Sequence, residues 1–235
     1  MIVRAIKTSI FRANEDLLAF IQANIPKLKD GSIVVITSKV VALAEGRVAD
    51  ARDKEKLIKR ESTWALQTHR EWWWTEKDGA LLVNAGIDDS NANGKLILLP
   101  KDSFQTAEDL RAKLHQLYKV KLMGVIITDS RISPMRAGVT GLAVGYAGFR
   151  GVRDYRGKKD IFGKKLKVTL TDVADSLATA ATLVMGEGAE RQPLAIIEDA
   201  PVEFVDRVNR REVQIAAKDD MYSSLFRRMR GKRSR

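Results

Sequence analysis

Two uninterrupted apolar runs constrain the fold of this chain more than any other feature of its sequence. The first covers residues 32–37 and the second covers residues 122–128. A strand with one face in water alternates apolar and polar residues, whereas a strand covered on both faces is apolar throughout. We therefore predict two central strands of a sheet with helices packed on its faces, as in an α/β or mixed α+β protein.

Weaker patterns predict further elements around these strands. Short strands are expected at 3–6, 80–84, 96–99, 166–170 and 194–197, and helices after Asp16, at 38–47, at about 106–118 and from Asp172 to about 185. Thr106 is the expected N-cap of the third helix, with Asp109 three residues later. Residues 51–75 are polar and mostly helical in pattern, with Trp72, Trp73 and Trp74 at their end. We expect one or two of these Trp to anchor a core or interface; a platform that stacks an aromatic ligand is the alternative.

Composition excludes several classes of site. The 235 residues include no Cys and only His69 and His115, so disulfides, zinc fingers and three-histidine zinc sites are excluded. Both His are expected at the surface. A metal, if bound, is expected to be a hard ion on carboxylates. No apolar stretch is long enough for a membrane helix, and no signal peptide opens the chain, so the expected location is the cytoplasm.

The net charge of +11 is concentrated at the C-terminus. Six cations lie in the last nine residues: Arg227, Arg228, Arg230, Lys232, Arg233 and Arg235. We divide the chain into a main domain at 1–220, which we expect to contain two subdomains, and a basic tail at 221–235. The tail is interpreted as a solvated end, with contact to nucleic acid as the alternative.

Polar loops follow several predicted strands. Asp88 lies in a loop after one strand, and Asp129 and Ser130 follow the second apolar run. Carboxylates at the carboxyl ends of buried strands often contact ligands, and Asp88 and Asp129 could together hold Mg²⁺ or Mn²⁺. The competing interpretation is that these residues only form turns. A glycine-rich loop at 186–190 is either a helix cap or a phosphate contact.

Five arginines follow Asp129 closely. They are Arg131, Arg136, Arg150, Arg153 and Arg156. Guanidinium groups suit capture of phosphate or carboxylate, and local surface ion pairs are the alternative. No Walker-type phosphate loop is present, and the glycines of 138–151 lack the dinucleotide-binding spacing.

An ordered series of motifs gives the chain a family resemblance. The motifs occupy 30–41, 44–47, 83–91, 124–130, 136–138, 143–145, 154–157, 160–163, 173–175 and 185–188. Together they resemble the coenzyme F420 gamma-glutamyl ligases, which add glutamate to a deazaflavin coenzyme precursor. The resemblance implies a mixed α+β fold of two intertwined subdomains and a homodimer.

The resemblance also implies an activity and site residues. It implies a ligase that uses GTP and Mg²⁺ or Mn²⁺ to join L-glutamate to an anionic carboxylate acceptor through an acyl phosphate. Implied metal ligands are Asp88, Asp129 and Ser130, where Ser replaces a family Thr. Implied nucleotide contacts are Thr8, Ser9, Ile10, Phe11, Ser38, Lys39, Asn91, Gly186, Glu187, Gly188 and Gln192. No residue is identified as a general base.

One position departs from the family pattern. Leu43 stands where the family has a lysine that contacts the nucleotide. Lys39 lies four residues earlier, which places it on the same helical face, and we expect it to supply the missing cation. The alternatives are a paralogue that acts on a different acceptor and a non-catalytic regulator that binds nucleotide and metal without turnover.

Overall fold

The computed structural model describes residues 1–68, 71–216 and 218–224. These residues form two units. The first unit is Met1–Arg47 with Pro100–Val213, and the second is Val48–Leu99 with the described residues from Gln214 onward. The basic tail cations at 227–235 and His69 lie outside the described residues, so the expectations about them stay predictions. The division at residue 220 likewise stays a prediction.

The first unit is built on a five-stranded sheet in the order β1-β12-β2-β8-β9. Its strands are β1 (Ile2–Ile6), β2 (Ser32–Thr37), β8 (Met123–Ile132), β9 (Val139–Ala147) and β12 (Leu194–Glu198). The neighbours β2 and β8 are parallel, and the other three pairs are antiparallel. The two apolar runs are therefore adjacent central strands, as predicted, and the expected mixed α+β class is confirmed.

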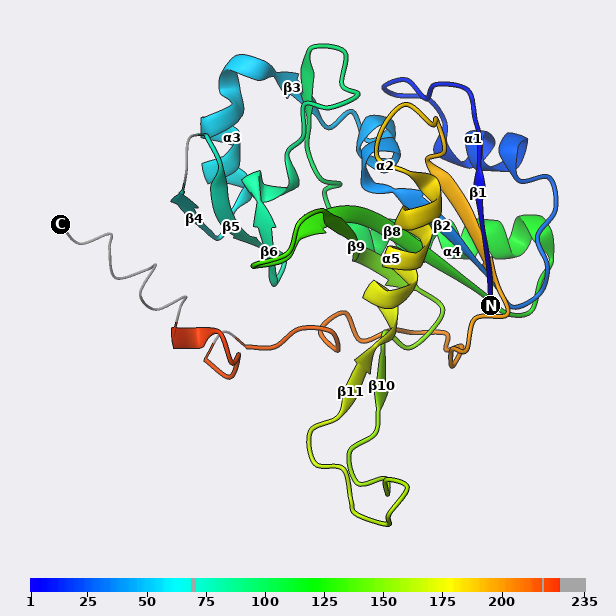
Figure 1. Cartoon of the computed structure of the whole chain (residues 1–235). Coiled ribbons are helices and arrows are strands. Elements are labelled where there is room, and N and C mark those ends of the chain that lie inside the picture. Colours follow the sequence, from blue (N-terminus) through cyan, green and yellow to red (C-terminus); the bar gives the residue numbers. More distant parts are fainter. Residues whose placement is uncertain (69–70, 217, 225–235) are drawn as a thin grey trace. The chain divides into compact units, whose positions relative to one another are not determined.

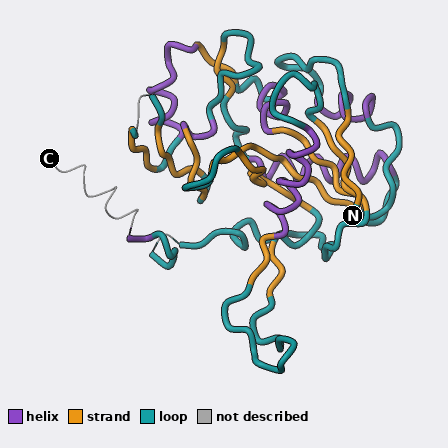
Figure 2. The backbone as a smooth tube through the Cα atoms, viewed as in Figure 1, coloured by secondary structure: helices purple, strands orange, loops and turns teal. Residues whose placement is uncertain are grey.

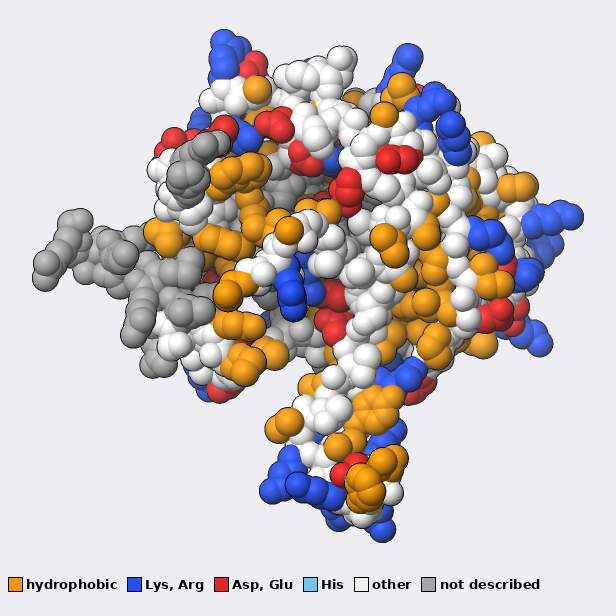
Figure 3. Space-filling model, in the orientation of Figure 1, with side chains coloured by type: hydrophobic (Ala, Val, Ile, Leu, Met, Phe, Trp, Pro, Cys, Tyr) orange, Lys and Arg blue, Asp and Glu red, His pale blue; other side chains and the backbone are white. Residues whose placement is uncertain are grey.

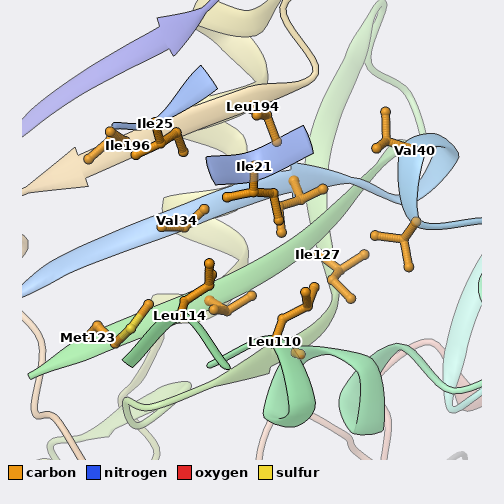
Figure 4. Packing of buried hydrophobic residues seen from close by; sticks show 14 of the residues in the cluster. Ile21, Ile25, Val34, Val40, Leu110, Leu114, Met123, Ile127, Leu194 and Ile196 are labelled. Atoms are coloured by element: carbon orange, nitrogen blue, oxygen red, sulfur yellow. The ribbon is translucent and has the colours of Figure 1, made fainter. Parts of the chain in front are cut away.

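Helices cover both faces of this sheet (Figure 1). They are α1 (Leu17–Asn24), α2 (Ser38–Ala44), α4 (Ser103–Tyr118) and α5 (Val173–Met185). Val34 and Ile36 of β2 belong to one core cluster with residues of α1, α2 and α4, while Ile33 and Val35 belong to a second cluster with α5. Figure 4 shows the first cluster, with Ile21 and Leu114 near the strands. The alternation of side chains along β2 explains why the run is apolar throughout.

Two helix starts test the capping predictions. Asp172 caps α5 by accepting a hydrogen bond from the Asp175 backbone amide at 2.9 Å, as predicted. The cap of α4 is Asp102, which accepts from the Gln105 amide at 2.8 Å. The prediction of Thr106 as the cap was wrong, because Asp102, one turn earlier, caps the amide three residues after it. His115 is exposed in the last turn of α4, as expected.

A long arm extends from the first unit (Figure 2). Its base is the antiparallel pair β10 (Val152–Asp154) and β11 (Leu170–Asp172), and residues 155–169 form its outer part. The strand predicted at 166–170 was wrong in its bounds, because only Leu170 of that range pairs with β10.

The second unit contains two small sheets. Strands β3 (Val48–Asp50) and β7 (Lys95–Ile97) pair antiparallel, and β4 (Trp64–Gln67), β5 (Trp73–Lys77) and β6 (Ala80–Val83) form a meander. The 3-10 helices η1 (Ala51–Asp53) and η2 (Asn84–Gly86) and the helix α3 (Lys54–Glu61) complete it. The prediction that 51–75 is mostly helical was therefore wrong beyond Glu61. Trp73 packs against the core of this unit, whereas Trp72 is 52% exposed.

No helix in the described part of the chain is long and apolar enough to span a bilayer. This finding agrees with the expectation drawn from the sequence, and the cytoplasmic location stays a prediction.

Candidate active site

One edge of the five-stranded sheet gathers most of the predicted site segments. Strands β1, β2 and β8 run in the same direction, and β12 runs against them. The carboxyl ends of three strands therefore meet the start of β12 at a single edge. Ligands of open sheets commonly bind outside the carboxyl ends of strands. The segments that begin at Thr8, at Ser38 and at Gly186, together with Asp129 and Ser130, all lie at this end of their strands.

Hydrogen bonds tie the loop before β12 to its neighbours. The Thr8 amide donates to the Arg191 carbonyl at 2.9 Å, and the Thr37 amide donates to the Pro193 carbonyl at 3.0 Å. The end of the loop at 186–192 is thereby attached to the segments that follow β1 and β2. Three of the predicted nucleotide-binding segments are thus neighbours in the folded chain.

A side-chain contact connects the same loop to β8. The Ser130 hydroxyl donates to Glu187 Oε1 at 2.6 Å. A hydroxyl that donates its proton keeps its oxygen lone pairs available for a cation. Within the loop, the Gly188 amide donates to Glu190 Oε2 at 2.8 Å, and Gly186 has a φ of +80°. The glycine-rich loop is therefore organised by its own carboxylates, one of which also orients Ser130.

The position of Asp129 and Ser130 corrects the sequence interpretation. Both lie within β8, paired with Leu142 and Gly141 of β9, and not in a loop after the strand. A register irregularity follows Ile127, where β8 passes from its apolar run to its polar end. The strand continues beyond the apolar residues because β9 supplies backbone partners there, which no local pattern could reveal. Asp129 and Ser130 are both half-buried.

Asp88 and Asn91 belong to the second unit. The Asp88 carboxylate accepts from the Ser90 amide at 2.7 Å and from the Ser90 hydroxyl at 2.9 Å. Its backbone exchanges two hydrogen bonds with Ile97. Asp88 thus organises its own turn, which is the turn-forming interpretation made from the sequence. Its binding of a metal ion, its sharing of that ion with Asp129 and a nucleotide contact at Asn91 all stay predictions.

The backbone just before Asp88 has a feature that sequence reasoning missed. Asn84, Ala85 and Gly86 have φ values of 52°, 57° and 70°. An alanine in this left-handed conformation costs roughly 1–2 kcal/mol. Two hydrogen bonds hold it, from the Trp73 amide to Asn84 Oδ1 at 2.9 Å and from the Ala85 amide to Thr75 Oγ1 at 2.8 Å. Asn and Gly commonly adopt a positive φ, whereas Ala does not, so the sequence gives no signal for the conformation of Ala85.

Three predicted nucleotide contacts, Thr8, Phe11 and Ser38, have buried side chains. Phe11 is buried and packs edge-to-face on Phe20, with ring centroids 4.8 Å apart. Ser38 is buried at the first residue of α2. Only the backbone of Phe11 is therefore suited to contact a ligand. Leu43 packs against the first core cluster, so its side chain replaces a cation with an apolar contact.

The oxygen donors suit a hard divalent cation. Across the three described ranges, no three His, Asp or Glu side chains are grouped so as to hold a metal by themselves. Mg²⁺ typically takes one or two carboxylates and completes its shell with water and substrate phosphates. Asp129 and the Ser130 hydroxyl are donors of this kind, so the residues at this edge fit such an ion together with a nucleotide.

A charged network lies along α5 and links it to the sheet. Arg131 Nη1 lies 3.0 Å from Asp175 Oδ2, and the other Asp175 oxygen accepts from the Ala143 amide at 3.0 Å. Burial raises the pKa of Asp172 to about 6, and the nearby Asp175 carboxylate adds to this rise. Arg131 was one of five arginines noted in the sequence, and its partner here is structural.

The remaining arginines of that group are divided in role. Arg150 pairs with Glu203 at 2.8 Å, and Arg156 pairs with Asp154 at 2.7 Å. Local ion pairs therefore account for Arg131, Arg150 and Arg156, as the surface interpretation expected. Arg153 contacts neutral oxygens, those of the Pro201 carbonyl and the Tyr155 hydroxyl.

Known proteins match this chain over most of its length. The sequence profile described as F420-0:Gamma-glutamyl ligase matches residues 5–60 and 53–199. The chain is 34% identical over 224 residues to "Coenzyme F420:L-glutamate ligase" of Methanocaldococcus jannaschii, an alignment covering 86% of this chain and 89% of that protein. It is also 34% identical over 208 residues to the protein of the same name from Archaeoglobus fulgidus, covering 80% of this chain and 83% of the relative.

These matches define the class as enzymes that form a carbon–nitrogen bond. Within that class, the chain belongs to the F420-0:gamma-glutamyl ligase family. The resemblance drawn from the motifs is thereby confirmed.

Proposed function

We propose that this chain is a GTP- and divalent-metal-dependent ligase that joins L-glutamate to the carboxylate of a deazaflavin F420 precursor. The observation that carries the proposal is the convergence of Thr8, Ser130 and loop 186–192 at one sheet edge through backbone and side-chain hydrogen bonds. The names of the relatives support the glutamate and the F420 precursor as substrates.

The proposed reaction proceeds in two transfers. The acceptor carboxylate attacks the γ-phosphorus of GTP, and GDP leaves with the electrons of the broken P–O bond. The amine of glutamate then attacks the acyl carbon, loses a proton and expels phosphate. A bound Mg²⁺ or Mn²⁺ supplies charge neutralisation for the phosphoryl transfer. The first transfer turns oxide, a poor leaving group, into phosphate.

The chain's own residues would position these groups. Asp129 and the Ser130 hydroxyl would hold the cation, with Asp88 as a further ligand. Glu187 accepts the hydrogen bond from the Ser130 hydroxyl, which leaves the lone pairs of that oxygen available to the cation. The loop that begins at Gly186 would contact phosphate oxygens through the Gly188 amide, which would exchange its hydrogen bond to Glu190 for one to phosphate. The Gly186 amide donates to the Thr182 carbonyl as the cap of α5. Thr8, Ser9, Ile10, Phe11, Ser38, Lys39, Asn91 and Gln192 stay proposed nucleotide contacts, and a homodimer stays part of the proposal.

The first test is thermal stabilisation by GTP and by ATP, each with Mn²⁺, with Mg²⁺ or with neither. A ligand at a hundredfold excess over its dissociation constant stabilises the folded state by roughly 2.7 kcal/mol. We expect a metal-dependent shift for the wild type that Asp129→Ala abolishes. The exposed Asp109→Ala on α4 is the matched control and should keep the shift. A shift that survives Asp129→Ala would refute the assigned metal ligand, and no shift with any nucleotide would refute the nucleotide site.

Leu43 supports a second candidate, a protein that binds nucleotide and metal without turnover. Its side chain packs on the core where the family pattern has a cation.

Lys39 lies one turn earlier on α2, on the same face, and we propose that it supplies this charge. Lys39→Ala should weaken GTP binding at least tenfold, and unchanged affinity would remove this role. Mass spectrometry of F420-0 incubated with GTP, Mn²⁺ and glutamate separates the candidates, because only the ligase adds a glutamyl residue.

A further inference from the structure

A cavity at the base of the arm has no role in the proposed phosphoryl transfer. Its volume is about 490 Å³, within the range of small-molecule sites. It belongs entirely to the first unit. The lining comes from β10, β11, the start of α5 and the segment at 202–212. The lining residues are Arg150, Val152, Arg153, Asp154, Arg156, Lys158, Leu170, Val173, Val202, Glu203 and Glu212.

The charges around this cavity do not cancel. Arg150 and Arg156 are neutralised by Glu203 and Asp154. The third carboxylate, Glu212, accepts from the Tyr146 hydroxyl at 2.7 Å and from the Gly151 amide at 2.6 Å. Both donors are neutral, so Glu212 keeps its negative charge, and the lining as a whole has four cations against three carboxylates.

Two cations of the lining have neutral partners instead. Arg153 donates to the Pro201 carbonyl, and its second contact is the Tyr155 hydroxyl at 3.4 Å. The Lys158 ammonium lies over the Tyr155 ring, 5.1 Å from its centroid. The hydrogen-bond partners of Arg153 are thus neutral, and Lys158 shares the charge of Asp154 with Arg156, so one positive charge of the lining has no matching carboxylate. Such pre-positioned cations suit a phosphate or carboxylate of a ligand.

The rest of the wall is apolar. Val152, Leu170, Val173 and Val202 contribute aliphatic surface beside the cations. Figure 3 shows that Lys and Arg side chains gather on the arm beyond this base, where they add to the positive potential. The combination suits an organic anion that also carries an apolar body, and it does not suit an inorganic ion alone.

The cavity and the reactive edge lie at opposite ends of α5. The first residue of α5, Val173, lines the cavity, and the loop with Glu187 follows its last residue. A helix of 13 residues is about 20 Å long. If the phosphates of a nucleotide lie beside Ser130, they are therefore far from this cavity. A ligand that reaches both places is extended and has its reacting carboxylate at one end.

We infer that this cavity binds the non-reacting, anionic part of the carboxylate acceptor, through Arg153 and Lys158. The inference rests on the proposed function for the identity of the acceptor. It deepens that function by assigning acceptor recognition to the arm, separate from nucleotide binding at the sheet edge.

The test compares two double variants of the same arm. Arg153→Gln with Lys158→Gln removes both cavity cations, and Lys159→Gln with Lys167→Gln removes two lysines of the arm that do not line the cavity. The probe is F420-0, whose binding is followed by deazaflavin fluorescence without nucleotide. The metal-dependent thermal shift by GTP is measured on the same proteins.

We expect the cavity double variant to weaken F420-0 binding at least tenfold, the control double variant to stay within twofold of wild type, and both to keep the GTP shift. Equal weakening in the two double variants would overturn the inference in favour of diffuse attraction. Absence of F420-0 binding to wild type, or loss of the GTP shift in the cavity variant, would also overturn it. Lys158→Gln alone, which leaves the Arg153 contact to Pro201 intact, should weaken binding at least threefold.

Failure of the proposed function has a different signature. If GTP gives no shift while F420-0 binding still depends on the cavity cations, the ligase proposal fails and the acceptor cavity remains. If the GTP shift depends on Asp129 and F420-0 binding is unchanged without the cavity cations, the acceptor cavity is refuted and the ligase proposal remains.

Discussion

Gly141→Ala is predicted to destabilise the first unit strongly, although local propensity favours the substitution. Gly141 lies in β9 with an ordinary backbone, so an alanine there should by itself stabilise the strand by roughly 0.5–1 kcal/mol. A Cβ at this position, however, would lie 2.4 Å from the carbonyl carbon and oxygen of Ala178 in α5. The two effects have opposite signs, so the sign of the measured change decides between them.

The size of the effect follows from the kind of atom that the Cβ meets. The nearest atoms are helix backbone, which has no rotamer to change. Ordinary contact begins at about 3.4 Å, so α5 would have to move by about 1 Å from the sheet. That movement would loosen the buried contacts of Ala174, Leu177 and Ala181. Overpacking of this kind typically costs 1–3 kcal/mol, and we expect about 3 kcal/mol because the clash cannot be relieved locally.

Urea and thermal unfolding of purified protein test this expectation. A loss of about 3 kcal/mol corresponds to a fall in Tm of roughly 6–12 °C for a chain of this size. Thr140→Ala is the matched control, because Thr140 precedes Gly141 in β9 and is exposed. Its effect should remain within about 1 kcal/mol. A Gly141→Ala protein as stable as wild type, or more stable, would refute the close approach of α5 to β9.

Three smaller effects should be measurable by the same unfolding assays. Because burial raises the pKa of Asp172 to about 6, the folded chain keeps a proton that the unfolded chain loses, and this group's contribution to stability falls as the pH rises from about 4 to 6. Asp172→Asn should remove that fall, and an unchanged slope of unfolding free energy against pH would contradict this prediction. Arg4 lowers the pKa of Glu198 through a hydrogen bond, and Lys29 lowers it further, so Glu198 stabilises the fold above about pH 4.5 and this stabilisation is lost as the pH falls through the lowered pKa. Glu198→Gln should reduce the loss of stability at acid pH, and a loss as steep as that of wild type would count against the ion pairs. Asp102→Ala should cost about 1 kcal/mol by leaving the Gln105 amide of α4 without its cap, whereas Asp109→Ala should change stability little, and equal effects would argue against the cap.

The sequence predicted the centre of the first unit because its signals are local. The apolar runs of β2 and β8 reflect burial on both faces, and Asp172 marks the start of α5 by a cap that needs only neighbouring residues. In contrast, the pattern of 51–75 predicts helix where β4 and the start of β5 form. The polar residues of 51–61 do form η1 and α3. The next segment, however, is a meander in which β4 pairs with β5 and β5 with β6, and strand formation there depends on that pairing more than on propensity.

The glycines of 138–151 show a different limit. The sequence marks this segment only as glycine-rich and predicts no strand there, yet Val139–Ala147 is strand β9. Gly141 lies against the backbone of α5, and a Cβ at Gly145 would come within 2.4 Å of the Ser103 backbone in α4. These glycines are needed for close approach of helices on opposite faces, a long-range requirement that leaves no local pattern. The same strand supplies the partners that keep Asp129 and Ser130 in β8, so without β9 the sequence places these two residues after the strand.

The seam between Gly141 and Ala178 connects the two proposed binding regions. Ala178 lies near the middle of α5, whose first residue lines the arm cavity and whose last residue precedes the loop that reaches Ser130. A shift of about 1 Å at the middle of a short helix is carried to both ends, since the helix moves as a rigid rod. Gly141→Ala, studied at a temperature where it stays folded, should therefore weaken both GTP and F420-0. The cavity cations and Asp129 should each affect one ligand only. If α5 sets the spacing between acceptor recognition and phosphoryl transfer, substitution of Gly141 should weaken the binding of both ligands. Substitutions at either end of α5 should weaken the binding of one ligand each.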